Sequence, residues 1–90
     1  MGYQSLGDFC AEYASSHSYD EPGVFGQTTS LDKMTVVRET PDRARVEARW
    51  YTCGHDPDSG CWDVFERTAV VLVKRHDGWH PQFEENFGYE

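Results

Sequence analysis

The chain has 90 residues, the size of one small domain, so residues 1–90 are assigned to a single domain. Eight Lys and Arg stand against sixteen Asp and Glu, which gives a formal net charge of −8. No apolar stretch approaches the roughly 18–20 residues of a membrane span, and no basic segment followed by an apolar one marks a signal peptide. Three cysteines are too few for a secreted disulfide scaffold. These features predict a cytoplasmic protein without membrane contact.

The first predicted element is a helix over residues 5–16. Its apolar side chains follow the i, i+3, i+4, i+7 spacing of one helical face: Leu6, Phe9, Cys10 and Tyr13. Ser5 precedes this stripe and can cap the helix. Residues 17–32 are rich in Gly, Ser, Thr and Asp around a Pro-Gly pair, a composition that predicts a loop.

Four strands are predicted next, over residues 33–39, 43–52, 62–75 and 79–84. In the second strand apolar side chains alternate with charged ones, which is typical of a half-buried antiparallel strand. The third strand holds the apolar run from Ala69 to Val73 and is predicted to be central. Asp77-Gly78 then favours a tight hairpin turn. The predicted fold is α+β, with the N-terminal helix packed on a four-stranded antiparallel meander sheet.

A helix followed by such a meander resembles the cystatin-like plan, and residues 43–83 resemble the NTF2-like superfamily. The similarity rests on a long strand, Thr68 to Arg75, that turns through Asp77-Gly78 into a final strand opening with Trp79. The resemblance implies a small-ligand-binding or catalytic domain, with Trp50, Trp79 and the histidines along a concave sheet. The resemblance assigns no catalytic residue in this chain. The chain has no nucleophile elbow, phosphate-binding glycine loop or metalloprotease motif, so an enzyme is not predicted.

The polar segment 53–61, predicted to be a loop, contains Cys53, His55 and Cys61. Thiolate and imidazole are zinc ligands, and a histidine from elsewhere in the chain would have to complete such a site. The two cysteines also flank the base of a hairpin loop, where a disulfide can form. A third interpretation is two free thiols. No cofactor is predicted.

Charge is distributed unevenly along the chain. All eight cations lie between Lys33 and Arg75, a segment with a net charge of +1, whereas the flanking segments carry −9. A field of that sign repels nucleic acid and membranes and attracts a basic protein partner. Aromatic residues among the flanking acids can anchor an interface. The predicted partner-binding residues are Asp20, Glu21, Glu84, Glu85 and Tyr89.

These features favour a small acidic protein that inhibits a partner by occupying its basic, nucleic-acid-binding surface, without direct binding to nucleic acid. In size and charge the chain resembles phage-encoded inhibitors of host defence, including anti-CRISPR proteins, and immunity proteins to toxic nucleases. One alternative is the minimal NTF2-like domain that binds or converts a small ligand. Another is a structural module, either stapled by a metal or formed as a homodimer through an exposed edge strand.

Overall fold

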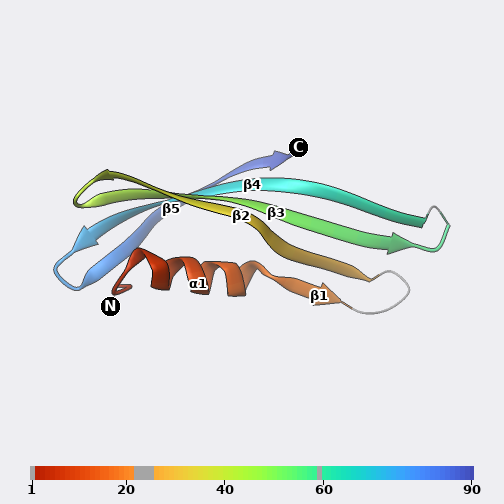
Figure 1. Ribbon diagram of the computed structural model, residues 1–90, viewed down its shortest axis with the longest axis horizontal. Coiled ribbons are helices and arrows are strands. Elements are labelled where there is room, and N and C mark those ends of the chain that lie inside the picture. The colour runs from red at the N-terminus through yellow and green to blue at the C-terminus, as the bar shows by residue number, and fades with distance from the viewer. Residues whose placement is uncertain (1, 22–25, 59) are drawn as a thin grey trace.

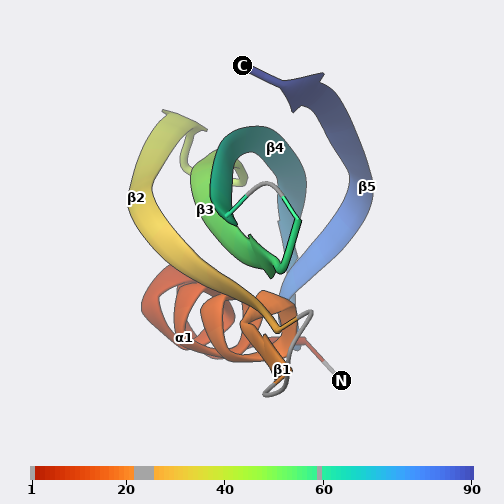
Figure 2. The same ribbon diagram turned by 90° about the vertical axis from the view of Figure 1, so that its right-hand side faces the viewer.

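A computed structural model describes residues 2–21, 26–58 and 60–90. In these residues one helix, α1 (Leu6–His17), precedes five strands: β1 (Tyr19–Glu21), β2 (Gln27–Thr40), β3 (Arg43–Asp56), β4 (Gly60–Arg75) and β5 (Gly78–Tyr89). The strands form one antiparallel sheet in sequence order. The sheet twists and curls into a half-barrel, and α1 lies across one of its faces (Figure 1, Figure 2). The molecule is elongated, with extents of 53 × 23 × 17 Å.

The predicted α+β fold with a four-stranded meander is wrong. The described residues are mostly sheet, with five antiparallel strands and one short helix. The additional strand, β1, and the first residues of β2 fall within the predicted loop 17–32, of which residues 22–25 lie outside the described residues. Threonines make this segment look polar, yet threonine suits a half-exposed pleated strand. The hydroxyls of Thr29 and Thr52 meet at 2.8 Å and join β2 to β3.

β3, β4 and β5 also extend beyond their predicted ends. β3 ends at Asp56 and β4 begins at Gly60, so both include part of the predicted loop 53–61, where His55 pairs with Cys61. β5 reaches Tyr89 and does not end at residue 84. Neighbouring strands pair the backbone of these polar segments while one face stays wet, so polar composition does not end a strand. The turn before β5 also differs, because Gly78, with φ at +124°, is already the first residue of β5.

The helix begins and ends one residue later than the predicted range 5–16. Ser5 is its N-cap, and its hydroxyl oxygen accepts a hydrogen bond from the backbone N–H of Asp8 at 3.0 Å. Phe9 and Tyr13 are buried against the alternating side chains of β3, namely Ala44, Val46, Ala48 and Trp50. That alternation is confirmed. No helix among the described residues has the length and apolar character needed to cross a membrane.

A buried polar network centres on Thr68 of β4. The indole N–H of Trp50 donates to the Thr68 hydroxyl at 2.8 Å, and the hydroxyls of Tyr13 and Thr68 are 2.7 Å apart. Tyr13 also donates to Oε1 of Glu84 at 3.0 Å. Because the phenol has one proton, the Thr68 hydroxyl donates to Tyr13 while it accepts from Trp50. The network therefore joins α1, β3, β4 and β5.

Replacing Thr68 with valine should destabilise the protein by about 1–3 kcal/mol, because the buried indole N–H of Trp50 loses its acceptor while side-chain volume is kept. Urea unfolding followed by circular dichroism measures the change. Thr35→Val is the matched control, since Thr35 is exposed on β2, and it should change stability by less than about 0.5 kcal/mol. Equal stability of the two variants would mean that the network does not stabilise the core.

Tyr13 should make stability depend on alkaline pH. Burial and the hydrogen bond to Glu84 raise the pKa of Tyr13 to about 12, whereas an unfolded tyrosine ionises near pH 10. Its contribution is therefore complete below pH 10 and is lost as the pH rises toward 12. Between pH 9 and 11, unfolding free energy should fall less steeply in Tyr13→Phe than in the wild type. Tyr89→Phe, at an exposed position, should keep the wild-type slope.

Candidate functional site

α1 covers only part of the sheet face on which it lies. The β3–β4 hairpin and the start of β2 extend well past the C-terminal end of the helix (Figure 1). In this uncovered part is a hollow of about 370 Å³, which we call the helix-side hollow. Its lining residues are Gln27, Thr29, Thr52, Trp62, Val64, Glu66 and Tyr89. Because paired residues of an antiparallel sheet share a face, this hollow lies on the same face as the core residue Trp50, the partner of Glu66.

Trp62 is the largest side chain of the hollow, and a glycine makes room for it. Trp62 on β4 pairs with Gly54 on β3, and a Cβ added at Gly54 would overlap the indole. Any other residue at position 54 would push the ring away from the sheet. Trp62 is 41% exposed, whereas Trp50 and Trp79 are 2% and 3% exposed in the core. The sequence therefore holds one tryptophan against the sheet with much of its surface open to solvent.

Tyr89 reaches the same face because β5 carries a bulge. Asn86 pairs with Thr68 and Tyr89 pairs with Glu66, so three steps along β5 match two along β4. Gly88, inside this bulge, has φ at +81°, and its N–H donates to Oδ1 of Asn86 at 2.7 Å. With the extra residue, the Tyr89 side chain projects from the helix-side face. It is 70% exposed, which leaves nearly the whole ring available for contact.

The charges around the hollow are negative. Glu66 belongs to its lining, which contains no Lys or Arg. Glu84 projects from the same face of β5, opposite Val70, with Oε1 3.5 Å from Nε2 of His17 at the end of α1. Glu66 therefore shares the hollow with the exposed rings of Trp62 and Tyr89 in a lining without lysine or arginine, whereas Glu84 lies farther along β5, beside Tyr13 and His17.

The eight cations of the chain lie elsewhere. Arg38 and Lys74 are on the helix-side face but at its other end, with their charges 5.5 and 6.0 Å from the ring centroid of Trp79. The strand register places the other six on the opposite face, which we call the far face: Lys33, Arg43, Arg45, Arg49, Arg67 and Arg75. Successive side chains of a strand point to opposite faces, so the sheet separates these six cations from the acidic hollow.

The five predicted partner-binding residues do not form one surface. Glu84 and Tyr89 are on the helix-side face, whereas Glu85 pairs with Ala69 on the far face. Asp20 accepts a hydrogen bond from the hydroxyl of its partner Thr28 at 3.1 Å, and Thr28 is also on the far face. The backbone of Glu21 pairs with Gln27, but its side chain lies outside the described part of the chain.

Trp62 and Glu66 are the functional candidates that sequence reasoning missed. The signal for Trp62 is the alternation of β3, which continues from Trp50 through Thr52 to Gly54. Two further pairs along this alternation, beyond Trp50 and Glu66, place Gly54 opposite Trp62. Trp50 and Trp79, which the NTF2-like alternative places along a concave sheet, are buried in the core.

The segment with Cys53, His55 and Cys61 is strand on both sides of its hairpin. Cys53 pairs with Asp63, and Cys61 pairs with His55, so the thiols occupy diagonal positions. Diagonal Cβ atoms lie about 7 Å apart, too far for the roughly 4 Å of a disulfide, and all three cysteines are free. Cys61 Sγ is 3.6 Å from Nδ1 of His55. Among the described residues no group of three or more potential ligands could hold a metal ion.

Comparisons of the chain with protein-family models, with curated proteins and with solved structures find no match. The candidate site therefore rests on the chain's own geometry.

Gly54→Ala tests the placement of Trp62. The added methyl group overlaps the indole, so Trp62 should move into solvent, with red-shifted tryptophan emission and stronger quenching by iodide. Gly7→Ala is the matched control, because a Cβ at Gly7 meets only an ordinary contact with Ser5 at 3.7 Å. It should leave the spectrum unchanged. An unchanged spectrum in Gly54→Ala as well would mean that Trp62 does not depend on this glycine.

Proposed function

We propose that the protein is a small acidic binding protein that inhibits a partner by covering a basic, nucleic-acid-binding surface with its helix-side hollow. The observation that carries the proposal is the combination of two exposed aromatic rings, Trp62 and Tyr89, with Glu66 and Glu84 on a face whose cations stand at the other end. Aromatic anchors that pair with charge are typical of protein interfaces.

The hollow has the chemistry to hold an arginine or lysine side chain. An aromatic face attracts a cation, most strongly when the ring is that of tryptophan. A guanidinium stacked on Trp62 would be within the hollow that Glu66 also lines, where a carboxylate can accept its N–H groups. Carboxylates held in this way take the place that backbone phosphates occupy on the partner. Occupation of those cations would prevent nucleic acid from binding.

The net charge of −8 supports the same function through association kinetics. A strongly acidic protein is steered toward a basic surface, and the association rate falls as salt screens the field. The six cations on the far face project away from the approaching partner when the hollow docks. The orientation of docking is thereby fixed, because the far face would bring like charges together.

The first experiment is affinity capture from the lysate of the source cells at low and at high salt, with mass spectrometry of the bound proteins. We expect one dominant partner with a basic, nucleic-acid-binding surface, lost at high salt. Purified protein should then displace nucleic acid from that partner. Absence of a partner at either salt, or a partner that keeps its nucleic acid, would contradict the proposal.

A double variant that removes two negative charges tests the acids of the helix-side face. Glu66→Gln with Glu84→Gln should raise the Kd for the captured partner about tenfold at low salt, equivalent to ~1.4 kcal/mol, with a smaller effect at high salt. The matched control, Asp63→Asn with Glu85→Gln, removes the same charge from the far face and should leave the Kd within about twofold. Equal weakening by both variants would mean that net charge, and not the position of these acids on the helix-side face, determines binding.

A further inference from the structure

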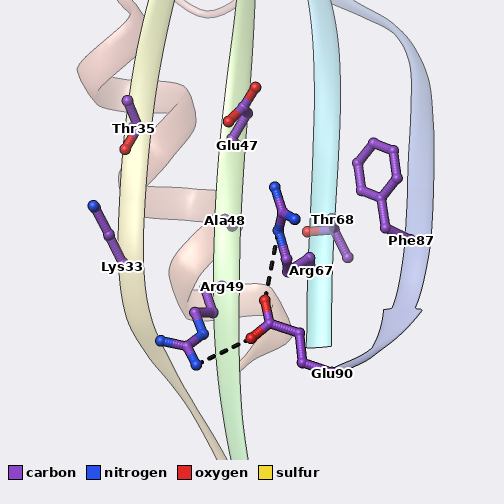
Figure 3. A pocket seen from close by; sticks show the side chains of 9 residues that line it. All are labelled: Lys33, Thr35, Glu47, Ala48, Arg49, Arg67, Thr68, Phe87 and Glu90. Carbon is purple, nitrogen blue, oxygen red and sulfur yellow. Dashed lines mark ion pairs between the residues drawn. The ribbon is translucent and has the colours of Figure 1, made fainter. Parts of the chain in front are cut away.

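A second hollow lies on the far face, away from α1. Its volume is about 420 Å³, and three cations line it: Lys33 of β2, Arg49 of β3 and Arg67 of β4 (Figure 3). Phe87 of β5 stands at its side, and the carboxylate of Glu90 lies between the two arginines. Three cations around one concavity are unexpected in a chain with a net charge of −8.

Arg49 is held in a fixed orientation but is incompletely paired. Its guanidinium stacks on the ring of Phe65, with Cζ 3.8 Å from the centroid. Nη1 is 3.4 Å from Oδ2 of Asp32, and Nη2 is 3.0 Å from Oε2 of Glu90. The Nε atom is buried and has no hydrogen-bond partner among the described residues. A buried donor without a partner is uncommon in folded proteins.

The other two cations are also available to a ligand. Arg67 Nε lies 3.6 Å from Oε1 of Glu90, which is longer than the 2.7–3.2 Å or so of a hydrogen bond. Lys33 forms no ion pair with any described residue. Glu47, the second acid of the lining, is already paired with Arg45 at 3.1 Å. The carboxylate of Glu90 thus lies between two arginines that it satisfies only in part.

We propose that this far-face hollow binds a small ligand that carries a carboxylate and an aromatic ring, and that Glu90 occupies the carboxylate position when the ligand is absent. The position between Arg49 and Arg67 already accommodates a carboxylate. Glu90 can leave it at small cost, because ion pairs between partly exposed side chains contribute little to stability. The backbone N–H of Glu90 donates to the carbonyl of Phe65 at 2.8 Å, so the side chain can turn away while the strand end stays in place.

The preference for a ring comes from Phe87. This side chain is half-exposed and lies with Arg67 Cζ 5.9 Å and Arg45 Cζ 5.7 Å from its ring centroid. A ligand ring can pack against Phe87 while its carboxylate is held by the arginine forks. The volume of the hollow is within the range of small-molecule sites.

Benzoate is the probe, followed by the arginine Nε–Hε signals in ¹H–¹⁵N NMR spectra. Benzoate should shift the signals of Arg49 and Arg67 saturably, and Arg67→Gln should abolish binding without loss of fold by circular dichroism. In Glu90→Gln the internal competitor is gone, so the Kd for benzoate should fall at least about fivefold. Glu85→Gln removes the same charge from the same face and should keep the wild-type Kd.

Three outcomes would overturn the proposal. The first is no saturable shift at Arg49 and Arg67 in either the wild type or Glu90→Gln. The second is an equal Kd in those two proteins, or an equal gain in Glu85→Gln, because displacement of Glu90 would then play no part. The third is tighter binding of acetate or inorganic phosphate than of benzoate, whereas we expect both to bind more weakly. Tighter binding of phosphate would assign the arginines to a phosphate group.

Discussion

The position of the helix depends on one buried hydrogen-bond network. Thr68 accepts from Trp50 and donates to Tyr13, and Tyr13 donates to Glu84. Each of these four side chains comes from a different element, so the helix cannot shift along the sheet without leaving a buried donor unpaired. The rings of Tyr13 and Trp50 meet edge-to-face with centroids 5.4 Å apart. Polar and aromatic contacts therefore fix the same register between α1 and the sheet.

That register determines which part of the sheet stays open. A helix of 12 residues is about 18 Å long at 1.5 Å per residue, whereas the molecule extends over 53 Å. The remaining part of the helix-side face has no covering element among the described residues. Side chains that would be core residues under a longer helix, Trp62 above all, are instead exposed. The helix-side hollow is thus a consequence of a short helix on long strands, and its aromatic character continues that of the core.

The sequence predicts those features in which a local signal, such as a capping residue, agrees with the pattern of buried side chains. The cap at Ser5 and the alternation from Ala44 to Trp50 are examples. It does not predict the strand ends, because polar residues in an exposed strand end resemble a loop until their pairing partners are known. The sequence does not predict the candidate site for the same reason. Glu84 and Glu85 are adjacent in sequence, yet they project from opposite faces, and only the bulge at Gly88 brings Tyr89 to the side of Glu84.

The period of two residues also explains how one thin sheet carries two unlike surfaces. Along β4, Glu66 projects toward the helix-side hollow and Arg67 toward the far face. The end of β5 divides in the same way, because Tyr89 is in the first hollow and Glu90 is in the second. Consecutive residues therefore serve opposite faces, and sequence clustering of acids is a poor guide to surface charge here. The acidic character belongs to the segments outside residues 33–75, whereas the strand register determines where each charge acts.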